Sequence, residues 1–277
     1  MVGRVLRSAK VFPRQYWMLV SGSFLAATGA SMVWPFLMLY LTRRLDVPLA
    51  TISGLMTLNS AMGILCSFIA GTIADRMGRK NVMVASLLAG VGYFLLMSRD
   101  GSLLYYAALV GLWGGFNILY PVGANAMIAD LIPGEQRMKA YAIVRICQNA
   151  GVAMGPVSGG FLISISYNFA FFTAASSFLL YGLFTIFFVR ETLRNQDAGH
   201  APHLNALESS GYRQVFKDRV FMGFVACMSG AFIAGSMIFI MLPVYANQQF
   251  GLTEADSSWI ITVNAILCVT AQLLITR

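Results

Sequence analysis

Charge is scarce in this chain of 277 residues. Only 11% of its side chains are Asp, Glu, Lys or Arg, whereas soluble domains carry roughly 25%. In place of charge, 58% of the residues are hydrophobic, and the mean hydropathy is +0.71. Too few polar side chains remain to cover the surface of an ordinary soluble domain. The composition therefore predicts an integral membrane protein.

Cysteine chemistry is also lacking. The cysteines lie inside apolar runs and form no C-x-x-C pair, so we interpret them as packing residues rather than as metal or redox ligands. No phosphate-binding loop, nucleophile constellation or metal-ligand spacing occurs. We therefore expect neither an enzyme nor a bound cofactor or metal. The cysteines are Cys66, Cys147, Cys227 and Cys268.

Acidic residues are fewer than basic ones, 11 against 19, which gives a net charge of +8. A nucleic-acid-binding protein gathers its Lys and Arg on a soluble face, whereas here they lie between long apolar runs. We therefore expect no nucleic acid partner. The basic residues are better matched to the anionic membrane lipids of the inner leaflet.

The apolar runs are long enough to cross a bilayer, which takes about 20 helical residues. Because a helix satisfies its own backbone hydrogen bonds in lipid, these runs predict an all-α, multi-pass membrane protein. The first run is longer than the core of a secretory signal, so we expect no signal peptide. The eight predicted spans are Trp17–Leu41, Ile52–Ile73, Asn81–Met97, Leu103–Ile128, Ala140–Ile165, Phe169–Val189, Val220–Tyr245 and Ser257–Thr276.

Lys and Arg are unevenly divided between the connecting segments. With a cytoplasmic N-terminus, the inner segments hold 15 of them and the outer loops only three, Arg43, Arg44 and Arg99. The positive-inside rule therefore predicts that the N-terminus is cytoplasmic and that the chain resides in the cell (inner) membrane.

A repeat with an offset of 205 residues runs through the sequence. Residues 30–59 align without a gap with residues 235–264, and the alignment pairs Tyr40 with Tyr245 and Asn59 with Asn264. Span seven thus repeats span one, and six spans make one half. The predicted parts are a cytoplasmic N-terminus (1–16), a six-helix bundle (17–189), a cytoplasmic linker (190–219) and the first two helices of an incomplete second bundle (220–277).

The same offset makes Arg277 the counterpart of Thr72, so we expect the sequence to be a fragment of a longer transporter. A truncated chain that inserts into the membrane and transports nothing is the corresponding alternative. His200 and His203 fall in the linker and are interpreted as solvated residues.

Three motifs stand at or within the spans: G-x-x-x-D-R-x-G-R-K after span two, D-x-x-P-x-x-x-R between spans four and five, and G-x-x-x-G-P-x-x-G-G in span five. With them the chain resembles the major facilitator superfamily of secondary transporters, in particular bacterial multidrug efflux proteins, over nearly all residues after Pro13. The residues that carry the resemblance are Gly71, Asp75, Arg76, Gly78, Arg79 and Lys80; Asp130, Pro133 and Arg137; and Gly151, Gly155, Pro156, Gly159 and Gly160.

The first motif favours a gate. Gly78 permits a turn with positive φ, and Asp75 and Arg79 lie one helical turn apart if the end of span two stays wound. The resemblance implies that Arg79 lies near Asp130, in a network that latches the cytoplasmic side in one state. The alternative is that these charges only fix the topology and cap helix ends. The predicted gating residues are Gly71, Asp75, Arg76, Gly78, Arg79, Lys80, Asp130 and Arg137.

The glycines of span five recur every four residues, so they line one face and allow another helix to approach closely. Pro156 removes one backbone hydrogen bond and is expected to bend the helix. We predict a moving helix-packing hinge, with static small-residue packing as the alternative. In the resembled family this motif is associated with exporters that exchange a substrate for protons. The predicted hinge residues are Gly151, Gly155, Pro156, Gly159 and Gly160.

One position departs from such exporters: Leu109 stands where they usually carry an Arg, and no Asp, Glu or His lies in the middle of a predicted span. Intramembrane ionisable groups are the usual proton carriers. Within these residues the sequence therefore offers only Asp130, near the inner surface, for proton coupling; the alternative is a residue in the spans expected to be missing.

Polar side chains inside spans are costly unless they face a cavity or a partner helix. Arg145 is the one charge inside a span, and Gln148 and Asn149 share its helical face at i+3 and i+4. An interhelical hydrogen bond is the alternative role for each polar residue. The predicted substrate cavity is lined by Asn59, Asn117, Tyr120, Asn125, Arg145, Gln148, Asn149 and Asn264.

This lining is mostly apolar and aromatic with a few amides, which fits a hydrophobic or amphipathic compound better than a sugar. We predict a secondary transporter whose two six-helix halves rock about a midplane site. It would export small drug-like compounds as an antiporter, with protons as the candidate coupling ion. Import of a small nutrient or metabolite is the alternative.

Overall fold

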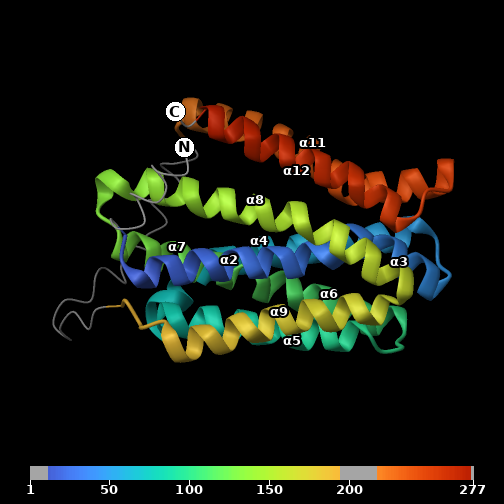
Figure 1. Ribbon diagram of the computed structural model, residues 1–277, viewed down its shortest axis with the longest axis horizontal. Helices are drawn as coiled ribbons and strands as arrows, with labels where there is room; N and C mark the ends of the chain where they lie inside the picture. Colours follow the sequence, from blue (N-terminus) through green and yellow to red (C-terminus); the bar gives the residue numbers. More distant parts are fainter. Residues whose placement is uncertain (1–11, 194–216, 276–277) are drawn as a thin grey trace.

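The computed structural model describes residues 12–193 and 217–275, which form helices and no strand (Figure 1). His200, His203 and most of the predicted linker lie outside the described residues. The described helices are α2 (Arg14–Val33), the 3-10 helix η1 (Trp34–Phe36), α3 (Leu37–Leu45), α4 (Leu49–Met77), α5 (Arg79–Met97), α6 (Leu103–Asn117), α7 (Leu119–Leu131), α8 (Gly134–Ile165), α9 (Tyr167–Phe188), α11 (Arg219–Phe250) and α12 (Glu254–Ile275).

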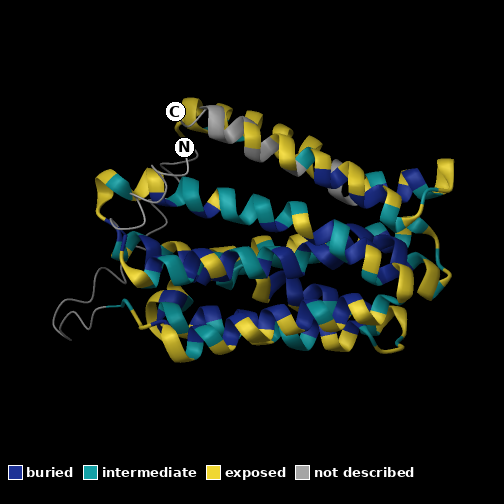
Figure 2. Cartoon of the chain, viewed as in Figure 1, coloured by how far each residue is buried: buried dark blue, intermediate teal, exposed yellow. Residues whose placement is uncertain are grey.

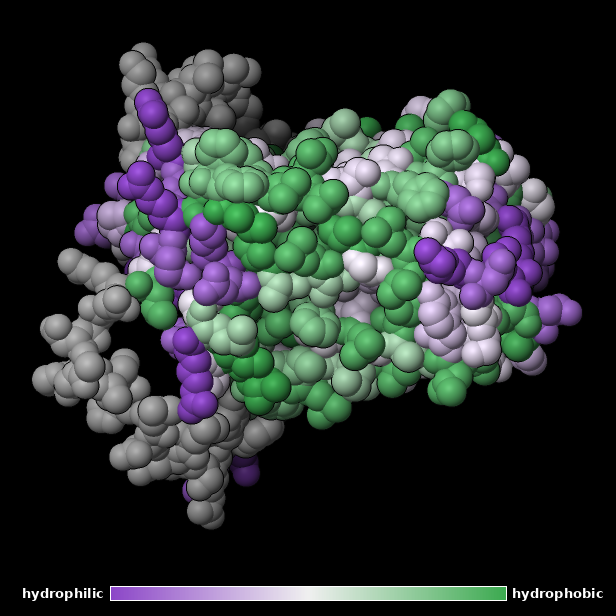
Figure 3. Space-filling model, turned by 90° about the horizontal axis from the view of Figure 1, so that it is seen from below, coloured by the Kyte–Doolittle hydropathy of each residue, from purple (hydrophilic) through white to green (hydrophobic). Residues whose placement is uncertain are grey.

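Six helical units among the described residues are long and apolar enough to cross a membrane: α2 to α3, α4, α5, α6 to α7, α9 and α11. The other two predicted spans correspond to α8 and α12, which fall outside this group. One face of the molecule carries a broad hydrophobic belt between two ends where hydrophilic residues gather (Figure 3). These features are those of an all-α membrane protein.

Prolines interrupt two of the predicted spans. The first breaks into α2 and α3 at η1, which contains Pro35. The fourth breaks into α6 and α7 at Ile118, because Pro121 has no N–H to donate to the carbonyl of Asn117, four residues earlier. Pro156, by contrast, lies inside α8, which continues through it as one helix.

Helix α2 lies in the middle of the bundle and packs along α8 and α9, while α4 packs on α6 and α5 on α9. Buried residues gather on α2 and on the helix faces around it (Figure 2). The glycines of α8 make the α2 contact close: a Cβ at Gly151 would lie 2.7 Å from the carbonyl oxygen of Phe24, and one at Gly159 only 2.2 Å from that of Met32. No other residue type fits at these positions without moving a backbone.

The 205-residue repeat is visible in the backbone. Helices α2 and α11 begin at Arg14 and Arg219. The α3 and α11 segments both end at a residue in the left-handed conformation, Asp46 with φ 49° and Gly251 with φ 65°. Helices α4 and α12 then begin at Leu49 and Glu254. Each pair differs by the same offset, so the hairpin of α11 and α12 repeats the hairpin of α2 to α4.

This second hairpin touches the rest of the protein near one end. We call that end, which includes Glu254, the far end, and the opposite end, which includes Gly78, the hairpin end. On α11, Val244 and Ala246 toward the far end are buried, whereas most residues in 219–236 are exposed. The hydroxyl of Thr262 in α12 donates to the carbonyl of Ala153 in α8, at 3.0 Å. The two hairpins are therefore joined at the far end, and Figure 1 shows α11 separated from α8 at the other.

The close approach of α2 and α8 predicts that Gly159→Ala destabilises the protein, because the new methyl group collides with the Met32 carbonyl. We expect a loss of about 1–3 kcal/mol in the free energy of unfolding, measured by SDS titration in mixed micelles. Gly230→Ala in α11 is the matched control, since a Cβ there meets nothing within 4 Å. Equal unfolding of the two variants would contradict the close packing.

Candidate functional site

The turn between α4 and α5 is built on Gly78. Its φ of 92° is in the region that favours glycine, and it ends α4 at Met77 and starts α5 at Arg79. Asp75 and Arg79 therefore belong to different helices, which corrects the expectation that they lie one turn apart on a wound end of span two. A Cβ at Gly78 would also lie 2.6 Å from a carboxylate oxygen of Glu191.

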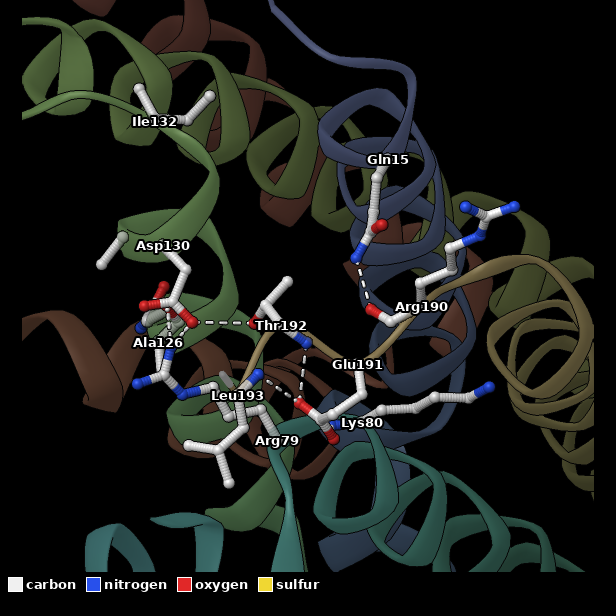
Figure 4. A network of polar contacts seen from close by, with 12 residues as sticks. Gln15, Arg79, Lys80, Ala126, Asp130, Ile132, Arg190, Glu191, Thr192 and Leu193 are labelled. Carbon is white, nitrogen blue, oxygen red and sulfur yellow. Dashed lines mark hydrogen bonds and ion pairs between the residues drawn. The ribbon is translucent and has the colours of Figure 1, made fainter. Parts of the chain in front are cut away.

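Arg79 forms an ion pair with Asp130 at the end of α7, as the family resemblance implies (Figure 4). The same carboxylate accepts a hydrogen bond from the Thr192 hydroxyl at 2.8 Å. The Arg79 side chain is only 16% exposed, whereas that of Asp130 is 32% exposed. The contact therefore joins three segments, the start of α5, the end of α7 and the residues after α9.

Glu191 completes this network from the segment after α9. Its carboxylate accepts the backbone N–H of Lys80 at 3.0 Å, where the start of α5 has no helical acceptor. It also accepts the backbone N–H groups of Thr192 and Leu193, at 2.9 and 3.0 Å. Glu191 thus caps α5 from a distance and orders the segment that brings Thr192 to Asp130.

The cations of the two motifs also bind carbonyl groups at helix C-termini, where positive charge is favourable. Arg79 donates to Ala126 at 3.1 Å and Arg137 to Ala129 at 2.6 Å, both near the end of α7. Lys80 donates to Ile186 in the last turn of α9, at 2.7 Å. In this conformation Arg79, Lys80 and Arg137 therefore cap helix ends, which is the role considered as the alternative to a gate.

The remaining gating residues on α4 make no such contacts. Asp75 and Arg76 are exposed and form no ion pair or side-chain hydrogen bond within the described residues. A Cβ at Gly71 would meet nothing within 4 Å. None of these three residues forms such a contact with another described helix in this conformation. A role in a gate would therefore require a second conformation in which they do.

Sequence reasoning missed Glu191 and Thr192, because both were assigned to the linker. The available signal was their position: Glu191 follows span six directly and is one of only 11 acidic residues in the chain. An acidic residue among basic segments is expected to pair with a cation or a helix N-terminus, but the sequence does not show which one.

A cavity of about 270 Å³ lies between α2, α7 and α8. Four of the predicted cavity residues line it: Tyr120, Asn125, Arg145 and Gln148. Sequence reasoning missed the polar contributions of α2 and of the first turns of α8. The remaining lining residues are Leu19, Ser23, Pro121, Ala124, Ile128, Tyr141 and Val144.

Four other predicted residues, Asn59, Asn117, Asn149 and Asn264, do not line this cavity. The Asn59 amide instead donates to the Val110 carbonyl at 2.9 Å and ties α4 to α6, which is the interhelical role considered as the alternative. Asn117 is exposed at the end of α6, next to the break before α7. Asn149 and Asn264 are half-buried on α8 and α12.

Some polar side chains of the cavity already form hydrogen bonds within the protein, and others do not. Tyr141 donates its hydroxyl to the Asn125 carbonyl at 2.9 Å, and Ser23 donates to Val20 at 2.8 Å. Arg145 and Gln148, in contrast, have no side-chain hydrogen bond or ion pair to any described residue. Hydrogen-bond donors therefore remain available on the α8 wall.

At the far end, Glu254 of α12 connects the two hairpins. It forms an ion pair with Arg43 of α3 at 2.5 Å and accepts the hydroxyl of Tyr167, at the start of α9, at 2.7 Å. Its side chain is only 11% exposed. The contact closes the far end between α3, α9 and α12.

The start of α12 is fixed by a capping box. Thr253 donates its backbone N–H to Asp256 at 3.0 Å, and Asp256 returns its own N–H to the Thr253 hydroxyl at 3.2 Å. Hydrogen bonds from the Thr253 side chain and backbone lower the pKa of Asp256 below its ordinary value. The cap holds the first turn of α12, and Glu254 with it, in place.

Helices of membrane-spanning length enclose a polar-lined cavity, with a charged network at one end and an ion pair between repeated hairpins at the other. Such an arrangement is typical of multi-pass helical membrane proteins that are built from repeats. The family model of the Major Facilitator Superfamily matches residues 19–277. The chain belongs to this superfamily.

Relatives of known name agree with this assignment. The chain is 28% identical over 269 residues to the uncharacterized MFS-type transporter YttB of Bacillus subtilis, covering 95% of this chain and 65% of YttB. It is 32% identical to a Na(+), Li(+), K(+)/H(+) antiporter of Planococcus maritimus, covering 82% of this chain and 56% of the antiporter. It is 23% identical to the multidrug resistance protein MdtH of Photorhabdus laumondii, covering 92% and 61%. The chain thus spans less than two thirds of the length of these relatives.

The shared acceptor at Asp130 predicts coupled effects on stability. Asp130→Ala and Thr192→Val each remove the same hydrogen bond, so we expect the double variant to lose about 0.5–1.5 kcal/mol less stability than the sum of the single variants. Unfolding of all four proteins in SDS mixed micelles measures the difference. Thr72→Val on the exposed end of α4 is the control and should combine additively with Asp130→Ala.

Proposed function

We propose that the protein exports small hydrophobic or amphipathic compounds by alternating access, and that a proton gradient drives the export. The observation that carries this proposal is the cavity between α2, α7 and α8. Apolar and polar side chains share its lining about equally, and it lies within helices of a superfamily of transporters. A lining of both kinds suits amphipathic ligands, which have an apolar part and a polar part.

Alternating access requires that the two ends open in turn. The contacts of Glu254 support a far end that is closed in this conformation. With the cytoplasmic N-terminus favoured by the positive-inside rule, this closed end is the outer one. In the opposite state, the two halves would separate at Arg43 and Glu254 and meet at the hairpin end.

The glycine stripe of α8 supports the same motion. Gly151, Gly155 and Gly159 bring α8 against α2, whereas a Cβ at Gly160 would lie 3.1 Å from Ala255 of α12. One helix therefore contacts both repeated hairpins through small residues, which offer little side-chain obstruction to sliding. The proposed hinge lies at these residues together with Pro156.

Direction and coupling rest on the relatives. The relative named for multidrug resistance in Photorhabdus favours export, and the Planococcus antiporter favours exchange for protons. Transport of metal ions by this cavity is disfavoured, because no carboxylate of the described residues lines it and hard cations prefer oxygen ligands, carboxylates among them.

The proposal predicts reduced accumulation of lipophilic dyes in cells that express the protein from its complete reading frame. A protonophore should abolish the difference from cells with an empty vector, because it removes the driving force. Time-resolved cell fluorescence measures both. Unchanged dye levels together with faster uptake of a polar nutrient would replace export by import.

If Asp75 belongs to a gate, its substitution should impair transport without changing the stability of the protein. Asp75→Asn should leave unfolding unchanged, because Asp75 has no partner among the described residues, and should slow dye export about tenfold if its charge is used in the opposite state. The control is Glu135→Gln, which neutralises another exposed acid toward the same end of the bundle. Normal export by Asp75→Asn would leave topology as the role of this charge.

A further inference from the structure

The α8 wall of the cavity carries a positive charge without a counter-ion. Arg145 lines the cavity and forms no ion pair with any described residue. Asp130 also lies on α7, after Asn125. Its carboxylate is already used, because it forms an ion pair with Arg79 and accepts a hydrogen bond from Thr192. A guanidinium in a partly apolar cavity favours an anion that it can bind bidentately.

The neighbouring polar groups extend this preference. Gln148 lies one turn from Arg145 on the same helical face and has no hydrogen-bond partner among the described residues. The Asn125 side chain faces the same cavity from α7. Their amide N–H groups can join the guanidinium in donating to a single carboxylate, whereas no Asp or Glu of the described residues lines the cavity to receive a cation.

Apolar side chains line much of the remaining wall, together with Ser23, Tyr120 and Tyr141. Leu19, Pro121 and Ile128 come from α2 and α7, and Val144 precedes Arg145 on α8. The volume of about 270 Å³ is close to the lower limit of pockets that hold drug-sized ligands, roughly 300–1,000 Å³. The cavity thus has room for a charged head group and the first apolar part of a longer molecule.

We propose that this cavity binds the carboxylate of an amphipathic organic anion, with Arg145 as its charged ligand and Gln148 and Asn125 as additional donors; Arg145 and Asn125 are exposed, so an anion can reach them directly. The inference rests on the proposed export function and narrows its substrate class: anionic amphiphiles are taken, neutral ones less well, and organic cations are repelled by the guanidinium. The anion is a mobile substrate rather than a phospholipid of the bilayer.

Three matched probes test the charge preference: 11-(dansylamino)undecanoic acid, its methyl ester, and an analogue with a quaternary ammonium in place of the carboxylate. Binding is followed by dansyl fluorescence to the protein, expressed from its complete reading frame, in phosphatidylcholine nanodiscs, with empty nanodiscs as the partition control. We expect the carboxylate to bind about tenfold or more tightly than the ester, and the ammonium probe not to bind above background.

Variants assign the preference to the guanidinium. Arg145→Gln should weaken carboxylate binding about tenfold or more while leaving the ester unchanged, and Arg145→Lys should retain part of the affinity because it keeps the charge without the planar fork. Lys139→Gln removes an exposed positive charge from the same helix and should change nothing. Equal losses of ester and carboxylate in Arg145→Gln would overturn the proposal, since Arg145 would then only shape the cavity.

Two further outcomes would also overturn it: binding of the ammonium probe as tight as that of the carboxylate, or displacement of the carboxylate by phosphatidylglycerol added to the nanodiscs, which would make the cavity a lipid site. Dye export by cells separates this inference from the proposed function. If the carboxylate binds in a way that depends on Arg145 but no probe is exported, the export proposal is wrong and the binding site stands. If wild type and Arg145→Gln export all three probes equally, export stands and the proposed binding site is wrong.

Discussion

The close contact between α2 and α8 is the constraint on which the rest of the structure depends. The oxygens of Phe24 and Met32 lie where side chains of α8 would stand if Gly151 and Gly159 were any other residue. Hydrophobic burial gives helices in lipid little reason to associate, so backbone approach of this kind supplies the contact. It also sets the cavity, because α8 then presents Arg145 toward α7 from beside α2.

Hydropathy was enough to predict helical spans, whereas three short motifs were needed to recognise the family, which the family model confirms. The 205-residue repeat found in the sequence reappears in the backbone, where Asp46 and Gly251 both have positive φ. The sequence did not predict which proline would interrupt a helix. Pro121 follows a break between two helices, while Pro156 lies inside an unbroken one that packs closely on α2. Whether a helix tolerates the lost hydrogen bond depends on its neighbours, which local sequence does not describe.

The polar residues divide along the same line. Sequence reasoning expected each of them to find a partner or a cavity, but it could not choose between the two. Asn59 found a backbone carbonyl on α6, because α4 and α6 pack directly, whereas Tyr120 and Arg145 face the cavity. Glu191 was missed altogether, since its partners at Gly78 and Lys80 lie more than a hundred residues away in the chain.

Helix α9 connects the two ends of the molecule more directly than its apolar sequence suggested. At its start, Tyr167 donates to Glu254, which closes the far end. Directly after its end, Glu191 caps α5, and Thr192 binds the Asp130 carboxylate that pairs with Arg79. Between these points α9 is a continuous helix packed on α5 and α2, so a displacement of its first turn at the far end cannot be absorbed locally. Helix α9 thus carries contacts at both ends that alternating access would have to break and reform.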